Sequence, residues 1–214
     1  GDVRDTVMIG GFGVPGTPFT LIQALVQQDA RNLTVIKNDA NEPDMGVDHL
    51  LRSGQVARLI TTHLGLNSHA IGLMNSGAID VEFNPQGILA ERIRAGGSGL
   101  GGVLSDIGIG TELAEGKQVV KMQGTTYLVE PALRADVALI HADRADTFGN
   151  LTYAATAQNF SPMMAMAAAC VIVEAETVVL PGEIAANAVQ TAGVFVDHVT
   201  QLENLSEEYA VVRR

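Results

Sequence analysis

The chemistry-bearing feature nearest the start of this sequence is a glycine-rich turn, residues 10–16, which we call the glycine turn. It follows the apolar run 7–9 and comes directly before a helical pattern of apolar residues over 19–26. Glycines let a ligand approach the backbone closely, and unpaired N–H groups at a helix start attract anions. We therefore expect the turn to contact an anionic ligand, the alternative being a tight connection with no ligand. Its residues are Gly10, Gly11, Phe12, Gly13, Val14, Pro15 and Gly16.

Residues 11–16 also match the G-x-G-x-x-G pattern of dinucleotide-binding proteins, and Asp39 stands near where a ribose-binding acid would be expected. Two prolines argue against this interpretation. Pro15 has no N–H to offer a pyrophosphate, and Pro18 removes a further donor at the helix start. A nicotinamide-dependent (NAD-type) oxidoreductase, or a ligand-sensing module with the same strand, turn and helix, therefore stays an alternative.

The remaining reactive side chains form no recognised set. His63 and His69 are six residues apart, and His141 stands two residues before Asp143, but neither spacing supplies three metal ligands. We therefore predict no metal ion. Cys170 is the only cysteine and lies in an apolar run, so it is better interpreted as a buried structural thiol than as a nucleophile. Structural or surface roles are expected for the carboxylates of Glu91, Glu115, Glu174 and Glu176.

Charge and hydropathy exclude two classes of partner. The net charge is −11 at neutral pH, whereas a protein that binds nucleic acid needs a positive face for the phosphates. No apolar run reaches the roughly 18 residues that cross a bilayer, so we predict no membrane segment. A lone cysteine cannot form an intrachain disulfide, which favours a reducing, cytoplasmic location. The chain begins Gly1-Asp2 without a methionine, so we expect a trimmed N-terminus.

The elements that must position these residues alternate between strand-like runs and helical patterns, which is typical of βαβ units around a mainly parallel sheet. Two runs joined through Gly124 predict a β-hairpin on that frame. Five glycines in 96–102 predict a flexible or tightly turned loop, and the acidic stretch 203–208 is expected to cap or solvate a last helix. The predicted strands are 6–9, 33–36, 56–62, 137–142, 171–174 and 194–197, the predicted helices are 18–28, 47–53, 88–95 and 163–169, and the hairpin strands are 119–123 and 126–130.

Hydrophobic residues make up 47% of the chain, which is enough for a large core. The sequence shows no internal repeat, low-complexity tract or linker. We therefore predict one domain over residues 1–214. Its expected fold is an open, mainly parallel α/β sheet flanked by helices, with a β-hairpin insertion.

Several long motifs, in sequence order, resemble those of the class I CoA-transferases of the 3-oxoacid or acetate–acetoacetate type, in their α subunit or N-terminal half. The glycine turn and the residues after it match the family's first motif, G-G-F-G-x-x-G-x-P-x-x-L-I. The stretch 84–97 is similar to P-Q-G-T-L-A-E-R-I-R-A-G-G, and 108–117 to G-x-G-T followed by E-G-K. Further matches lie at 133–140, 146–153, 159–162 and 194–197. The resemblance covers nearly the whole chain.

This resemblance implies transfer of CoA between an acyl-CoA and a carboxylic acid through a glutamyl intermediate. No cofactor is implied, because the CoA thioester is itself a substrate. In this family the nucleophilic glutamate lies in the β subunit, within an E-N-G-type motif. This sequence has no E-N-G, its nearest string being Glu203-Asn204-Leu205. We therefore expect a hetero-oligomer in which a β subunit supplies the catalytic glutamate.

The resemblance implies that this chain supplies the part of the site that stabilises the oxyanion and contacts the CoA. Gln86 matches the family's side-chain donor to the oxyanion, and its neutral amide donates at every working pH. The alternative is a turn glutamine that bonds a backbone carbonyl. The glycine turn would lie beside the CoA and the nucleophile at the subunit interface. Arg92, Arg94 and Lys117 are a candidate cluster for the anionic CoA, although solvation of the surface explains each of them singly.

Three departures from the family's motifs bear on the substrate. Ile88 stands where the family usually has Thr, Asp106 lies in a Ser-Asp-Ile stretch that replaces T-P-T, and Gln158 replaces a common Arg. We expect these residues to touch the acyl pocket or the subunit interface. The run 61–67 resembles the bacterial subgroup that acts on acetate, acetoacetate and butyrate. Short-chain carboxylic acids are therefore the expected substrates.

Overall fold

The computed structural model describes residues 5–209, and its larger sheet contains five of the six strands predicted outside the hairpin. Seven strands follow the order β11-β10-β8-β1-β2-β3-β4 with all neighbours parallel, and a short β9 pairs antiparallel with β8. The predicted open, mainly parallel sheet is therefore confirmed. The bounds are β1 Thr6–Ile9, β2 Leu33–Ile36, β3 Val56–Thr61, β4 Asp80–Phe83, β8 Ala135–Asp146, β9 Leu151–Thr152, β10 Ala168–Val179 and β11 His198–Gln201.

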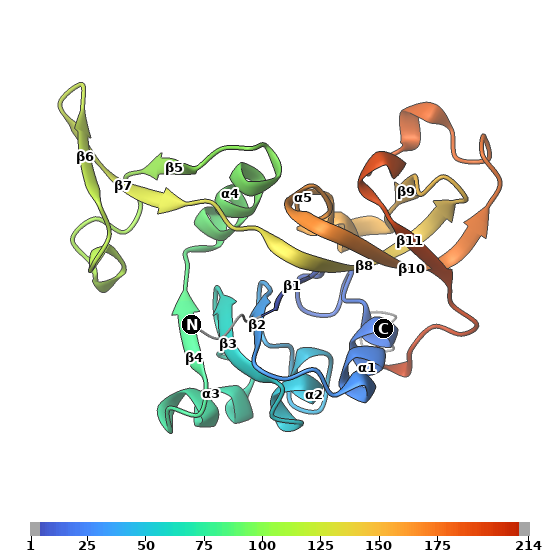
Figure 1. The fold of residues 1–214 in the computed structure, drawn as a ribbon, viewed down its shortest axis with the longest axis horizontal. Coiled ribbons are helices and arrows are strands. Elements are labelled where there is room, and N and C mark those ends of the chain that lie inside the picture. The colour runs from blue at the N-terminus through green and yellow to red at the C-terminus, as the bar shows by residue number, and fades with distance from the viewer. Residues whose placement is uncertain (1–4, 210–214) are drawn as a thin grey trace.

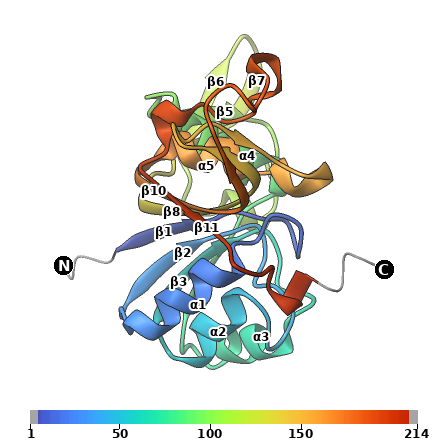
Figure 2. The same ribbon diagram turned by 90° about the vertical axis from the view of Figure 1, so that its right-hand side faces the viewer.

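Helices cover both faces of this sheet, with α1, α2 and α3 on one side and α4 and α5 on the other (Figures 1 and 2). The central strand β1 shows why both faces are apolar. Val7 and Ile9 join the core cluster beneath α1–α3, whereas Met8 joins the cluster beneath α4 and α5. Successive side chains of a strand point to opposite faces, so a doubly covered strand is apolar throughout. The helices are α1 Phe19–Gln28, α2 Val47–Arg52, α3 Ser68–Asn75, α4 Gln86–Gly97 and α5 Ser161–Ala167.

The strand order changes direction at β1. The chain runs outward from β1 through β2 and β3 to β4, then returns to β8 on the opposite side of β1. Loops that follow neighbouring parallel strands lie at the same edge, and ligands of such folds bind there, next to the reversal. The glycine turn, which follows β1, stands at this position.

The predicted hairpin is confirmed and belongs to a second, smaller sheet. Strands β6 (Val119–Met122) and β7 (Thr125–Pro131) pair antiparallel, and β5 (Gly102–Ser105), which the sequence did not predict, pairs with the other edge of β7. This sheet extends away from the main sheet beyond α4 (Figure 1). Short 3₁₀ turns complete the structure: η1 Glu112–Ala114, η2 Ala155–Gln158, η3 Ala186–Ala188 and η4 Gly193–Phe195.

The strand predicted over 194–197 is wrong. The chain forms the 3₁₀ turn η4 there, and β11 begins only at His198. Close packing at Gly193 explains the difference, because a Cβ at this position would lie 2.1 Å from the carbonyl oxygen of Phe148. The Gly193 N–H donates to the Asn150 side chain at 2.9 Å. The segment is thus bound to the loop after β8, and local strand propensity is overridden.

The loop predicted over 96–102 is wrong at both ends, because α4 continues through Gly97 and β5 begins at Gly102. A Cβ at Gly96 would lie 1.9 Å from the carbonyl oxygen of Leu133, and one at Gly97 would lie 2.6 Å from Cβ of Met166. These glycines therefore allow α4 to pack closely against α5 and the start of β8. Close approach of backbones is the reason for glycine here, and not a turn.

The last helix expected around 203–208 does not form there. Residues 203–206 follow an irregular path and a 3₁₀ turn occupies 207–209, beyond which the chain lies outside the described residues. This tail returns to the main sheet, where the ring of Tyr209 packs edge-on against Phe19 with centroids 4.8 Å apart. Within residues 5–209, no helix has the length and apolarity needed to cross a membrane.

Candidate active site

Four loops at one edge of the main sheet bring the candidate residues together. Strands β1 to β4 are parallel neighbours, so their carboxyl ends share that edge. The glycine turn follows β1, residues 37–41 follow β2, His63 follows β3, and Gln86 follows β4 as the first residue of α4. The two predicted site elements, the glycine turn and Gln86, therefore lie on the same edge.

The glycine turn is closed by its own backbone. The Phe12 N–H donates to the carbonyl of Pro15 at 3.0 Å, and the Thr17 N–H donates to the carbonyl of Val14 at 3.1 Å. The turn is thus a fixed shape and not a ring of free amide donors, which agrees with Pro15 inside it and Pro18 just after it. Its left-handed backbone needs glycine, with φ values of +103° at Gly11, +60° at Gly13 and +78° at Gly16.

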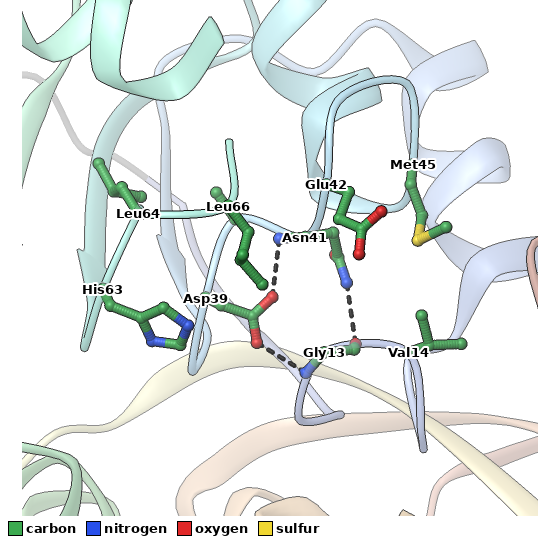
Figure 3. Close-up of a pocket in the computed structure, with 10 residues that line it drawn as sticks. Gly13, Val14, Asp39, Asn41, Glu42, Met45, His63, Leu64 and Leu66 are labelled. Carbon is green, nitrogen blue, oxygen red and sulfur yellow. Dashed lines mark hydrogen bonds between the residues drawn. The ribbon is translucent and has the colours of Figure 1, made fainter. Parts of the chain in front are cut away.

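The Asp39 carboxylate joins the glycine turn to the loop after β2 (Figure 3). Its Oδ2 accepts a hydrogen bond from the Gly13 N–H at 2.8 Å, and its Oδ1 accepts one from the Asn41 N–H at 2.7 Å. The Asn41 side-chain amide donates in turn to the Gly13 carbonyl at 2.9 Å. Gly13 is therefore fixed through both its N–H and its carbonyl.

Two more donors surround the same carboxylate. The Asn38 amide lies 2.9 Å from Oδ2, and the buried Lys37 ammonium lies 3.4 Å from Oδ1. Burial alone would raise the pKa of Asp39, but Lys37 and these hydrogen bonds together lower it. Burial lowers the pKa of Lys37, although Asp39 opposes that shift. Both oxygens of Asp39 are occupied, so the dinucleotide alternative loses the carboxylate that it needs for a ribose.

Gln86 is exposed at the edge of the sheet and directed by one contact. Its Nε2 donates to Oδ1 of Asn38 at 2.6 Å, and within residues 5–209 this is the only hydrogen bond of the side chain. The acceptor is a side chain from the loop after β2, not the local backbone carbonyl that a turn glutamine would use. An amide nitrogen carries two hydrogens, so one N–H remains for a ligand.

Two hollows flank the glycine turn. A small one of about 50 Å³ lies beside Gly13 and Val14 and is walled by Met45, Leu64 and Leu66 (Figure 3). A larger one of about 530 Å³ lies on the side of Pro15 and Gly16, near η2 and the tail. The turn thus stands between a small, mostly apolar hollow and a wider one lined by His141, Asp143, Glu176 and Tyr209 among others.

The histidines are distributed over separate contacts. His141 is buried, with Nδ1 at 2.9 Å from Glu174 and Nε2 at 3.3 Å from Glu176. His63 lies 2.9 Å from the Thr62 hydroxyl. Across the part of the chain that the structure describes, no three His, Cys, Asp or Glu side chains are grouped closely enough to hold a metal ion. Glu174 is buried in its contact with His141, whereas Glu176 is partly exposed and lines the larger hollow.

The three candidate cations are each paired with an acid of this chain and are therefore not free charges for an anionic ligand. The pairs are Arg92 with Glu82, Arg94 with Glu91, and Lys117 with Glu130. Two of the family departures are also placed. Ile88 is buried beneath the start of α4, and Gln158 accepts a hydrogen bond from Gln190 at 2.8 Å on the surface. Ile88 therefore does not present its side chain to the edge where Gln86 lies.

The sequence did not single out Asn38 and Asn41, and it assigned Asp39 a different role. The signal available was a polar run, Lys37-Asn38-Asp39, that begins where the buried strand β2 ends. Polar residues that are nevertheless fully buried need partners. Which partners they find depends on the neighbouring strands, which the local sequence does not show.

Comparison with known proteins places this geometry in a family. The family model described as Coenzyme A transferase matches residues 4–202. The chain is 48% identical to the "Probable coenzyme A transferase subunit alpha" of Bacillus subtilis, over 98% of this chain and 93% of that protein. It is 45% identical to the "Acetoacetyl-CoA:acetate/butyrate CoA transferase alpha subunit" of Clostridium acetobutylicum, over 92% and 90% of the two chains.

The fold has solved counterparts. An acyl-CoA transferase from E. coli O157:H7, solved as a thioester complex with CoA, superimposes with a TM-score of 0.83 at 24% identity. The match covers 96% of this chain and 46% of that one, so this chain spans about half of that structure. At this level of identity the likeness shows the fold alone.

Proposed function

The chain belongs to the coenzyme A transferase family, and from this membership we propose that it is the α subunit of a two-subunit short-chain acyl-CoA:carboxylate CoA-transferase. The proposed acids are of the acetate, acetoacetate and butyrate class. The name of the Clostridium relative, which is 45% identical, supports this substrate class. The observation that carries the proposal is the placement of Gln86 and Gly13 at one edge, connected through Asn38 and Asp39.

In the proposed reaction, a glutamate carboxylate of the β subunit attacks the thioester carbonyl, and the CoA thiolate leaves to give an acyl-glutamyl anhydride. The thiolate then attacks the glutamyl carbonyl, releasing the first carboxylate and forming a glutamyl-CoA thioester. The second acid reverses these steps. This chain supplies no E-N-G motif, and Glu174, its most deeply buried glutamate, is committed to His141 and the Leu21 N–H.

Gln86 is proposed to stabilise the oxyanion of these steps. Each attack turns a carbonyl oxygen into an alkoxide, and a preorganised donor aimed at that oxygen lowers the barrier. The Gln86 amide is neutral, exposed and fixed by Asn38 at 2.6 Å, with a second N–H to offer. Glycine-turn residues 10–16 would lie beside the thioester, where the absence of a side chain at Gly13, whose Cβ would meet no atom within 4 Å, permits close approach.

Exposed apolar side chains support a partner subunit. Large ones stand exposed just after β1, β3, β8 and β10 and just before β11. Single exposed ones need no explanation, but a set does. We propose that the β subunit covers them. They are Phe12 (46% exposed), Leu66 (67%), Phe148 (72%), Leu180 (67%) and Val194 (85%).

The charges of this chain indicate which part of CoA each subunit binds. Among the lysines and arginines of residues 5–209, only Lys121, Arg134 and Arg144 form no ion pair. With a net charge of −11 on the chain and so few unpaired cations among the described residues, this part of the protein is poorly suited to bind the phosphates of CoA. We therefore assign the nucleotide end of CoA to the partner and the thioester end to this chain. We place the complex in the cytoplasm, which the single free Cys170 supports.

Reconstitution tests the proposal. The chain alone should show no transferase activity, and co-expression with the β subunit should give a mixed oligomer that exchanges CoA between acetyl-CoA and butyrate. Robust turnover by the purified single chain would overturn the assignment of the nucleophile. Calorimetry with NADH serves as a control for the oxidoreductase alternative, for which binding is not expected.

Substitution of Gln86 tests its role in the reconstituted complex. Gln86→Ala should lower kcat by roughly 10²- to 10³-fold, the usual loss for one oxyanion donor, with little change in the KM for acyl-CoA. Gln86→Glu should be at least as harmful, because it replaces a donor with a repelling carboxylate. A normal kcat together with a lowered Tm would show that Gln86 contributes to stability and not to catalysis.

A further inference from the structure

We propose that Asn38 is a positioning residue that sets the orientation of the Gln86 amide and thereby fixes the oxyanion donor before substrate arrives. The inference rests on the proposed function, because it needs Gln86 to act as a donor. It adds a residue that neither touches substrate nor stands out in the sequence.

Asn38 is itself rigidly held. Its side chain is fully buried, and its backbone carbonyl accepts hydrogen bonds from the hydroxyls of Thr61 and Thr62 at 3.0 and 2.7 Å. The Thr62 N–H adds a third bond to the same carbonyl at 3.0 Å. The backbone of Asn38 is therefore tied to the end of β3, the strand between its own strand and the one that leads to Gln86.

The direction of the Asn38 amide is determined by Asp39. The Asn38 Nδ2 lies 2.9 Å from Oδ2 of Asp39, and an ionised carboxylate can only accept hydrogen bonds. The nitrogen of Asn38 must therefore face Asp39, which leaves its oxygen facing Gln86. That oxygen can only accept, so Gln86 must present its nitrogen at 2.6 Å and not its carbonyl.

These two hydrogen bonds determine that the amide nitrogen of Gln86, and not its oxygen, bonds Asn38, and that its second N–H faces the substrate. A flipped Gln86 would place two carbonyl oxygens in contact at Asn38, which is repulsive. An exposed glutamine without this contact would also sample several rotamers, and selecting one of them costs conformational entropy. The contact with Asn38 prevents both the flipped amide and the other rotamers before substrate binds. An oxyanion donor requires preorganisation of this kind.

The same Asp39 oxygen that fixes Asn38 also accepts the Gly13 N–H at 2.8 Å. The glycine turn and Gln86 therefore share one anchor, although they follow different strands. Substitution of Asn38 should therefore disturb the orientation of Gln86 and not that of the glycine turn, because Gly13 keeps its own bonds to Asp39 and Asn41.

A double-mutant cycle on the reconstituted complex tests the proposal. Asn38→Ala should lower kcat roughly 10-fold, the equivalent of one lost hydrogen bond, and leave the KM for acyl-CoA unchanged. In the Gln86→Ala background the same substitution should change kcat by less than about twofold, because the residue that it positions is gone. Gln55→Ala is the matched control, since it removes a fully buried amide that donates to the Leu25 and Ala30 carbonyls at the opposite end of β3 and should lower Tm without lowering kcat.

Asn38→Asp gives a second readout that does not depend on a truncated side chain. It keeps the shape and the acceptor for Gln86 but sets two carboxylates at hydrogen-bond distance, so the pair should take up one proton as the pH falls. The shared proton restores the donor to Asp39, and kcat relative to wild type should therefore rise from pH 8 to pH 6. The neighbouring charged or titratable groups are Lys37, Asp39 and, through Thr62, His63. They are present in both proteins.

The outcomes separate the two claims. A tenfold loss on Asn38→Ala in the Gln86→Ala background as well would make Asn38 merely structural and overturn the inference alone. A wild-type kcat for Asn38→Ala, or a kcat ratio for Asn38→Asp that does not change with pH, would also overturn it. A normal kcat for Gln86→Ala would remove the proposed donor, and the positioning role with it.

Discussion

Substitution of Gly13 should separate the function of the glycine turn from its folding. Gly13 has φ of +60°, and a Cβ built on it would meet no atom within 4 Å. Alanine there bears about 1–2 kcal/mol of left-handed strain, offset by about 0.4–1 kcal/mol from the less flexible unfolded chain. Gly13→Ala should therefore lower the free energy of unfolding by about 1 kcal/mol. The backbone cannot relax, since its N–H and carbonyl are both bonded.

Gly13→Val adds a branched side chain to the open space next to Gly13, at the sheet edge where Gln86 also lies. This is where we place the thioester and the partner subunit. We expect folding to survive and kcat to fall by about 10²-fold or more, the loss that a misplacement of about 1 Å can cause. Gly16→Ala is the contrasting variant. Its Cβ would lie 2.4 Å from the carbonyl oxygen of Ala157, which adds about 1–3 kcal/mol of overlap to the same backbone strain.

Urea unfolding of the chain, gel filtration of the complex and turnover assays would measure the three effects separately. The predicted order of stability is wild type, Gly13→Ala, then Gly16→Ala, while Gly13→Val loses activity out of proportion to its stability. A Gly13→Val complex that assembles and turns over normally would refute the reasoning and reduce the turn to a connector.

Two further predictions concern stability. Asp48 accepts hydrogen bonds from Arg52, Asn67, His69 and the Asp44 N–H; burial opposes them, but they lower its pKa to about 2. Since an unfolded Asp titrates near pH 3.9, this stabilisation is present above about pH 4 and is lost as the pH falls toward 2. The Tm difference between wild type and Asp48→Asn should therefore close over that range, and an equal difference at pH 6 and pH 2.5 would contradict the assignment. Gly96→Ala, whose Cβ would lie 1.9 Å from the Leu133 carbonyl oxygen, should lose about 2–3 kcal/mol, whereas Gly101→Ala, with open space around it, should be nearly neutral by urea unfolding.

The parts of the fold that could be predicted are those whose signal is local. β1 and β2 are buried on both faces, so their apolar runs stand out. β4 was missed because Asp80 and Glu82 interrupt it at the sheet's edge, where Arg58 pairs with both acids. Helix α3 was missed too, although its cap was present in the sequence: Asn67 Oδ1 accepts from the Ala70 N–H at 2.8 Å.

The candidate site shows the same limit. The glycine turn is one continuous segment, and its glycines and Pro15 dictate its shape locally. The Gln86–Asn38 contact joins the ends of β4 and β2 across β3, so it depends on the order and register of three strands. Glycine likewise has two meanings, a left-handed turn at Gly13 and a close helix contact at Gly96, and only packing distinguishes them.

Locating the covalent intermediate tests the central claim most directly. The reconstituted complex would be incubated with acetyl-CoA without an acceptor acid, digested, and its peptides analysed by mass spectrometry. The account predicts a CoA thioester on a glutamate of the partner subunit, none on any peptide of this chain, and formation roughly 10²- to 10³-fold slower with Gln86→Ala. A CoA adduct on one of this chain's own glutamates would contradict it.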